Sequence, residues 1–94
     1  MSSYYIISYD IVDQQGYEHY ASEVAQLLPQ YGAYVLFSDD SALTVEGDAS
    51  QVNAIVVFPT RESALQCYQS SKYQEIKKIR IKSVKNSRFV LATD

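Results

Sequence analysis

Residues 4–12, YYIISYDIV, decide the fold of this chain. Aromatic and β-branched residues dominate the stretch, which is the composition of a β-strand. Successive side chains of a strand point to opposite faces of its sheet, so the stretch divides into two sets. They are Tyr5, Ile7, Tyr9 and Ile11 on one face, and Tyr4, Ile6, Ser8 and Asp10 on the other. The first set is wholly apolar and the second begins with two apolar residues before Ser8 and Asp10, which predicts a sheet that is covered on both faces.

The pattern after this strand predicts a helix. Asp13 can accept hydrogen bonds from the free N–H groups of a helix start. Apolar residues then recur with the 3.6-residue period of one helix face. They are Tyr17, Tyr20, Ala21, Val24, Leu27, Leu28 and Tyr31. We expect Pro29 to loosen the last turn and Gly32 to form a left-handed C-terminal cap.

The rest of the chain completes a βαββαβ order. Residues 33–37 and 43–46 are expected to be two parts of one strand or a ragged hairpin arm, with a bulge or loop at 38–41 and a turn at Gly47. The other expected elements are a strand at 53–58 ended by Pro59, a helix capped by Thr60 that pauses at 70–71 and resumes over 73–80, and a last strand at 84 and 88–92. This order predicts one ferredoxin-like α+β domain over residues 1–94, with an antiparallel sheet and two helices on one face.

Two helices can cover only one face of such a sheet, and the strands at 53–58 and 88–92 are also apolar on both faces. Four strands of this length span roughly 400 Å². An apolar patch of that size is about the largest that monomers leave exposed. We therefore expect a second copy of the chain to cover it, in a two-fold homodimer with sheet against sheet.

The composition excludes several classes of protein. The chain has 94 residues, 47% of them hydrophobic and 20% charged, as in one folded domain and unlike a disordered chain. Its net charge of −3 argues against a nucleic-acid partner. RNA-binding RRM domains share the βαββαβ order, but their basic strand motif is missing from residues 53–58. Early polar residues rule out a signal peptide or membrane span at the N-terminus, so we expect a cytoplasmic location and no membrane partner.

Asp10 is the candidate catalytic acid or base. A carboxylate among apolar side chains is destabilised unless it is paired, or its pKa rises toward neutrality. The alternatives are that Asp10 is half solvated near the strand end, or that it pairs with Arg80.

A set of aromatic and polar side chains is the candidate ligand site. Tyrosines offer a flat ring and a polar tip to a planar organic ligand, although they can equally be core residues. Arg80, on an apolar helix face, can hold a carboxylate, or it pairs with Asp10 or Glu46. The candidate ligand-binding residues are Tyr17, Tyr20, Tyr68, Ser70, Tyr73 and Arg80, with Tyr9 as a further possible lining residue.

No cofactor or metal is expected. The only histidine, His19, lies off the apolar stripe and is expected to be exposed. The only cysteine, Cys67, allows no internal disulfide and no thiolate metal site, and is expected to be a buried structural thiol. Glycine-rich phosphate-binding motifs are absent from the sequence.

Several residue runs resemble the bacterial domain-of-unknown-function family 1330 nearly end to end. They are Asp10-x-x-Asp13-x-x-x-Tyr17-x-x-Tyr20, Tyr31-Gly32, Glu46-Gly47-Asp48, Phe58-Pro59-Thr60, Ala64, Tyr68-x-Ser70-x-x-Tyr73-Gln74 and Arg80. The resemblance implies a branch of the dimeric α+β barrel superfamily, in which two ferredoxin-like sheets enclose a cavity. That superfamily includes cofactor-free monooxygenases, isomerases and haem enzymes, and the family itself has no settled activity.

The chain departs from the pattern of the family it resembles. Tyr34 stands where that pattern has an arginine, and Val57 stands where it has a glutamate. Ala33, Cys67 and Lys72 replace a glycine, a tryptophan and an acidic residue. If the family's chemistry uses the two charged positions that are lost, this chain lacks it.

Two functions remain open at this point. The first is a cofactor-free enzyme or binding protein for a small, largely apolar organic molecule, with a cavity between sheet and helices or between subunits. The second is a non-catalytic dimeric accessory domain, in which the tyrosines and Asp10 are structural.

Overall fold

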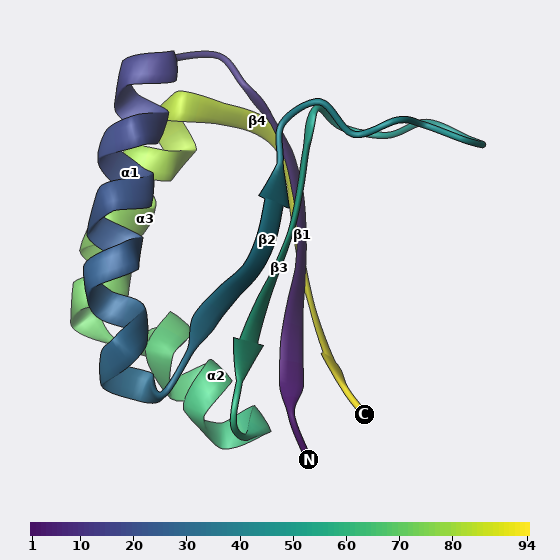
Figure 1. Cartoon of the computed structure of the whole chain (residues 1–94). Helices are drawn as coiled ribbons and strands as arrows, with labels where there is room; N and C mark the ends of the chain where they lie inside the picture. The colour runs from purple at the N-terminus through teal and green to yellow at the C-terminus, as the bar shows by residue number, and fades with distance from the viewer.

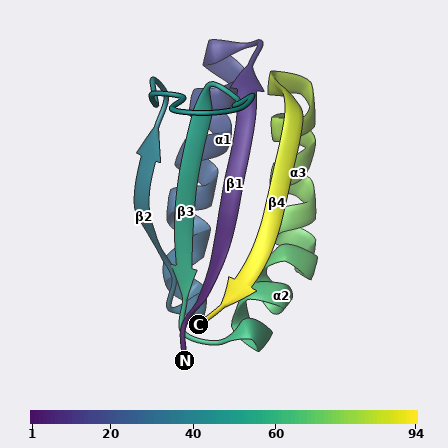
Figure 2. The same ribbon diagram turned by 90° about the vertical axis from the view of Figure 1, so that its right-hand side faces the viewer.

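The computed structural model describes all 94 residues as a sheet with helices packed on one of its faces (Figure 1). The elements are β1 (Ser3–Ile11), α1 (Gln14–Leu27), a 3₁₀ turn (Leu28–Tyr31), β2 (Tyr34–Asp39), β3 (Val52–Phe58), α2 (Arg61–Gln69), α3 (Ser71–Ser83) and β4 (Val84–Thr93). The strands are antiparallel in the order β2-β3-β1-β4 (Figure 2). This arrangement confirms the predicted ferredoxin-like fold, with the second helix divided into α2 and α3. No helix in the structure is long and apolar enough to cross a membrane.

Local capping explains where the helices begin and end. The Asp13 carboxylate accepts from the backbone N–H of Gly16 at 3.2 Å, and Thr60 forms a reciprocal capping box with Ser63. Gly32 takes a left-handed conformation with φ of 69°, after the 3₁₀ turn that contains Pro29. All three sequence predictions are confirmed. The break between α2 and α3 is also a cap, because the Ser70 hydroxyl accepts from the N–H of Tyr73 at 3.1 Å.

The segment between β2 and β3 differs from the prediction. Residues 43–46 form no strand, and residues 40–51 instead leave the sheet as an extended loop, which we call the arm. Figure 1 shows the arm projecting on the side of the sheet that faces away from the helices. Leu43 and Val45 are 86% and 90% exposed on it. A strand needs a hydrogen-bonding partner, and the β2–β3 pairing already ends at Asp39 and Asn53, so residues 43–46 have none.

The hydrophobic core lies between the sheet and the helices. It takes the odd-numbered side chains of β1, the even-numbered side chains of β3, and the facing sides of the three helices. Phe58 and Val52 are the largest apolar side chains that are fully buried. Cys67 lies in this core, as predicted.

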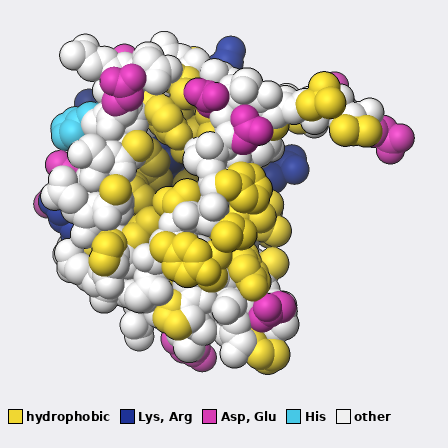
Figure 3. Space-filling view, viewed as in Figure 1, with side chains coloured by type: hydrophobic (Ala, Val, Ile, Leu, Met, Phe, Trp, Pro, Cys, Tyr) yellow, Lys and Arg dark blue, Asp and Glu magenta, His cyan; other side chains and the backbone are white.

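The opposite face of the sheet carries no helix, and we call it the free face. The strand register places eight apolar side chains there: Tyr4, Ile6, Tyr34, Phe37, Ile55, Val57, Val90 and Ala92. Ile6, Tyr34, Phe37 and Val90 are 46–55% exposed. Hydrophobic side chains gather below the arm in the space-filling view (Figure 3). The prediction that the sheet is apolar on both faces is therefore confirmed.

Gly16 is the point where α1 approaches the end of α3, and we expect Gly16→Ala to destabilise the protein. An added Cβ would collide with the Ser83 hydroxyl, which is buried and is held by its hydrogen bond to the Ile79 carbonyl at 2.7 Å. Overpacking of this kind costs about 1–3 kcal/mol, against a gain of about 1 kcal/mol in helix propensity. Urea unfolding should show a lower free energy of unfolding. Gln15→Ala, at the exposed neighbouring position, is the control and should stay within about 0.5 kcal/mol of wild type. An unchanged Gly16→Ala protein would mean that α3 can shift here.

Candidate functional site

Two adjoining cavities lie between the helices and the sheet. The larger, of about 120 Å³, is bounded by α1 and the edge strand β2, and the smaller, of about 40 Å³, lies deeper against α2 and α3. They share four lining residues: Ile7, Tyr20, Val24 and Val56. Figure 3 shows a hollow with hydrophobic walls between the helices and the sheet. An apolar cavity of about 150 Å³ can hold benzene, so this space suits a ligand with about one ring.

Tyrosine rings form much of these walls. Tyr9, Tyr17 and Tyr20 line the larger cavity, and Tyr20, Tyr68 and Tyr73 line the smaller one. The Tyr9 hydroxyl donates to the Tyr17 hydroxyl at 3.2 Å, and the hydroxyls of Tyr20 and Tyr73 are 2.8 Å apart. The structure thus brings together all four tyrosines of the candidate ligand-binding set. Tyr20 and Tyr73 are also buried core residues, so the core and lining interpretations both apply.

Burial keeps these hydroxyls protonated. It raises the pKa of Tyr9, Tyr20 and Tyr73 above the ordinary value, and that of Tyr5 to about 12. The Arg80 charge opposes the rise in the pKa of Tyr9, Tyr20 and Tyr73. These hydroxyl groups are therefore neutral, and because they hydrogen-bond to one another the cavity walls are almost wholly apolar.

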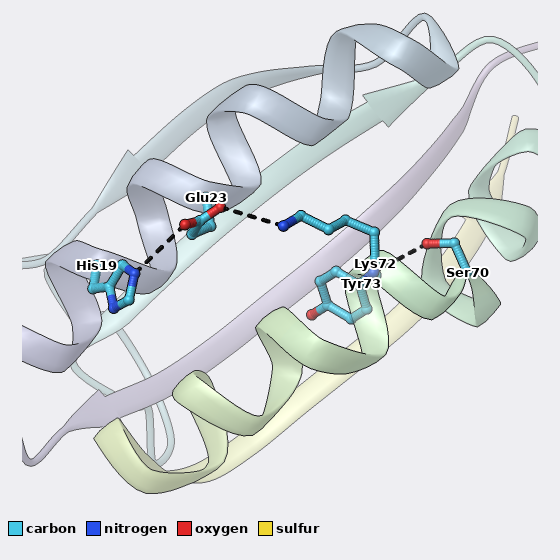
Figure 4. Close-up of polar contacts among 5 residues, drawn as sticks. All are labelled: His19, Glu23, Ser70, Lys72 and Tyr73. Carbon is cyan, nitrogen blue, oxygen red and sulfur yellow. Dashed lines mark hydrogen bonds and ion pairs between the residues drawn. The ribbon is translucent and has the colours of Figure 1, made fainter.

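Arg80, in the last turn of α3, is buried beside this site with 5% of its surface exposed. Its guanidinium lies over the ring of Phe89, 4.3 Å from the centroid, and Phe89 is a wall of the smaller cavity. Nη1 donates to the Ser87 hydroxyl, and the buried Nε has no partner. The ion pair with Asp10 or Glu46 that the sequence left open is not formed. The ion pairs of the structure join Glu23 to His19 and to Lys72 on the helix surface (Figure 4).

Asp10 lies on the free face, so the sheet separates it from the tyrosines and Arg80. Its carboxylate accepts from the side-chain amide of Asn86 at 2.9 Å and from the backbone N–H of Gln51 at 2.7 Å. These two hydrogen bonds lower its pKa, the opposite of the rise that a general acid near neutrality needs. With Ser8, Asn53 and Arg88 it lines a polar depression at the base of the arm. These hydrogen bonds indicate that Asp10 fixes the end of the arm to the sheet.

The remaining candidates have local roles. The Ser70 hydroxyl caps α3 through Tyr73 and donates to the Cys67 carbonyl at 2.7 Å, and it lines neither cavity (Figure 4). The side chain of His19 is 61% exposed, as expected. Burial raises the pKa of the Cys67 thiol to about 11, which keeps it unreactive. No three His, Cys, Asp or Glu side chains are close enough to hold a metal ion.

Tyr5 and Phe89 are among the cavity residues that sequence reasoning missed. Tyr5 donates to the Ala64 carbonyl at 2.9 Å, and its ring lies 6.1 Å from that of Phe89. The signal was present in the strand alternation, because both residues occupy core-face positions of paired strands. Only the β1–β4 register shows that they are neighbours.

The two positions that lack the family's charges are neighbours on the free face. Tyr34 of β2 and Val57 of β3 are Cα partners across the two strands. They lie on the opposite side of the sheet from the tyrosines and Arg80. The loss of those charges therefore leaves the cavity between sheet and helices unaltered.

The fold and the cavity define the class: a ferredoxin-like α+β domain of the kind found in dimeric α+β barrel proteins. The chain belongs to the family described as Domain of unknown function (DUF1330), whose model matches residues 2–93. A comparison with curated proteins gives no match.

Solved structures share the fold at low sequence identity. RPA0582, a protein of unknown function from Rhodopseudomonas palustris, is similar with a TM-score of 0.80 and 14% identity over 99% of this chain and 82% of its own. A dimeric ferredoxin-like protein of unknown function from Jannaschia sp. CCS1 has a TM-score of 0.77 and 8% identity, over 100% of both chains. SnoaB, a cofactor-independent oxygenase from Streptomyces nogalater, has a TM-score of 0.69 and 9% identity, over 99% of this chain and 92% of its own. At these identities the likeness establishes the fold alone.

Proposed function

We propose that this protein binds a small, largely apolar organic molecule between its helices and its sheet. The observation that carries the proposal is a tyrosine-lined apolar cavity beside a buried arginine with an unpartnered Nε. Tyr17, Tyr20, Tyr68 and Tyr73 would contact the ligand, and Arg80 would hold its polar end. Asp10 and Ser70 lie outside this arrangement.

The burial of Arg80 supports a functional cavity over a purely structural core. A buried charge without a counter-ion destabilises the folded state, whereas an apolar residue of similar size would not. Such groups concentrate at functional sites, where stability is given up for binding or catalysis. SnoaB performs cofactor-independent oxygenation on this fold. Cofactor-free turnover of the bound molecule is accordingly the enzymatic form of the same proposal.

Native mass spectrometry of the purified protein, followed by a thermal melt with a small-molecule library, tests the binding proposal. A ligand at 100 times its Kd stabilises by about 2.7 kcal/mol, and each kcal/mol raises Tm by about 4–8 °C in a domain of this size. Ala25→Trp should abolish that shift, because Ala25 is exposed on α1 and lines the larger cavity. Ser22→Trp, exposed on the same helix but outside both cavities, should keep it. No copurified ligand and no Tm shift would favour the second function, a non-catalytic accessory domain.

We also propose that two copies of the chain meet free face to free face. Eight apolar side chains cover this face, and the arm that projects beside it exposes Leu43 and Val45. A second copy would cover the sheet and give the arm an apolar surface to lie on. The Jannaschia protein, similar over its whole length, is itself dimeric, which supports this assembly.

A further inference from the structure

We infer that the bound molecule is a carboxylate of about one-ring size, an aryl or short branched-chain acid, whose charged end lies against the guanidinium of Arg80. The inference rests on the proposed function, because it names the class of molecule for the same cavity. It goes further in fixing the sign of the ligand's charge and the atoms that receive it.

Arg80 has no counter-ion within the chain. Arg80 is 5% exposed, and no Asp or Glu side chain forms an ion pair with it. The neighbours of the guanidinium are neutral: the Ser87 hydroxyl, the ring of Phe89 and the Tyr73 hydroxyl. An arginine stays protonated at any physiological pH. An anion from outside the chain would therefore complete this site.

The guanidinium of Arg80 keeps an unpaired N–H donor. Nη1 donates to Ser87, and the guanidinium also lies within reach of the Tyr73 hydroxyl, whereas the buried Nε has no partner in the chain. Nε and Nη2 lie along one edge of the planar guanidinium, and a carboxylate can accept from both with two parallel hydrogen bonds. The unpaired Nε is thus half of a bidentate carboxylate site. A single neutral carbonyl would satisfy only one of the two donors.

The Arg80 charge lies close to the two cavities. Phe89 lies against the guanidinium and forms a wall of the smaller cavity. The Arg80 charge also lowers the pKa of Tyr9, Tyr20 and Tyr73 against the effect of burial, which places it near hydroxyls of both cavities. Arg80 itself lines neither cavity, so the carboxylate of a ligand in the apolar space would meet the guanidinium at the edge of that space, beside Phe89 and Tyr73.

The volume and lining of the two cavities limit the size and polarity of the ligand. The two cavities, of about 120 Å³ and about 40 Å³, are lined almost wholly by apolar and aromatic side chains. A body with one ring, or a short branched chain, fits this space. A strongly polar anion such as a sugar phosphate does not, because its hydroxyls would find few partners among these walls.

Matched acid and amide pairs test the inference in the full-length protein. Benzoate with benzamide, and phenylacetate with phenylacetamide, keep the shape and change only the charge. We expect at least one acid to bind wild-type protein at pH 7 in calorimetry at least tenfold more tightly than its amide. Arg80→Met should remove that preference, and Lys82→Met, an equal charge loss at an exposed position of α3, should retain it.

The possible outcomes separate this inference from the proposed function. Amides that bind as tightly as the acids, or an acid preference that survives in Arg80→Met, would overturn the carboxylate inference and leave the binding cavity standing. Wild-type protein that binds neither these pairs nor any library compound would overturn both. The wild-type comparison requires no variant, so it decides the question even if Arg80→Met fails to fold.

Discussion

Ile6→Glu is expected to convert the protein from a two-subunit species to a single-subunit species at micromolar concentration. Ile6 lies at the centre of the free face, between its strand partners Ile55 and Val90. It is 46% exposed in the single chain, so a charge there leaves each subunit able to fold. In a two-fold interface the substitution buries two like charges without partners. That costs at least about 3 kcal/mol of association free energy, or more than about 100-fold in Kd.

A sizing column with light scattering measures this result, and circular dichroism verifies that the variant is folded. Leu65→Glu is the matched control, because Leu65 is a similarly exposed apolar residue, at 41%, on α2 and away from the free face. It should remain a two-subunit species. A wild-type protein that runs as one subunit, or an Ile6→Glu protein that stays paired, would contradict the proposed assembly.

The fold could be predicted from sequence because its determinants are local. The alternation within YYIISYDIV separates the two faces of β1, and Asp13, Gly32 and Thr60 mark helix ends through their own backbone hydrogen bonds. Each of these signals depends on residues a few positions apart. The predictions from these signals are correct because the tertiary packing favours the same local structure.

The candidate site was only partly predictable because it depends on which residues meet across the fold. Sequence alone could place Asp10 and Arg80 in an ion pair, since both are charged residues in apolar surroundings. Only the packing shows that the helices cover the odd-numbered face of β1, which puts Arg80 on one side of the sheet and Asp10 on the other. The arm failed as a predicted strand for the same reason, because strand pairing is a property of two segments.

The register of β2 and β3 relates the two positions at which this chain lacks the charges of the family pattern. The family pattern described above has an arginine and a glutamate where this chain has Tyr34 and Val57, and these residues are partners across β2 and β3. Opposite charges at such positions stabilise a strand pair, and so do an aromatic and a β-branched residue. On the pattern that the resemblance implies, we infer that the two differences are one exchange, which makes the free face more apolar and better suited to a second copy.

This exchange predicts strong coupling between the two positions. Val57 is 7% exposed, so Val57→Glu places an unpaired carboxylate in an apolar surface and is expected to lower the free energy of unfolding by about 3 kcal/mol. Tyr34→Arg alone should cost less, about 1 kcal/mol, because Tyr34 is 55% exposed.

The double variant Tyr34→Arg/Val57→Glu should recover at least about 1 kcal/mol relative to the sum of the single changes, because the two side chains can then form a cross-strand ion pair. Urea unfolding of all four proteins at one fixed concentration measures this coupling, since the stability of an assembly depends on concentration. Pairing Val57→Glu with Gln66→Arg, at an exposed position of α2 away from the free face, adds the same two charges and should recover nothing. Additive losses in the Tyr34→Arg/Val57→Glu protein would mean that the two positions changed independently, and that the loss of the charges has no common structural cause.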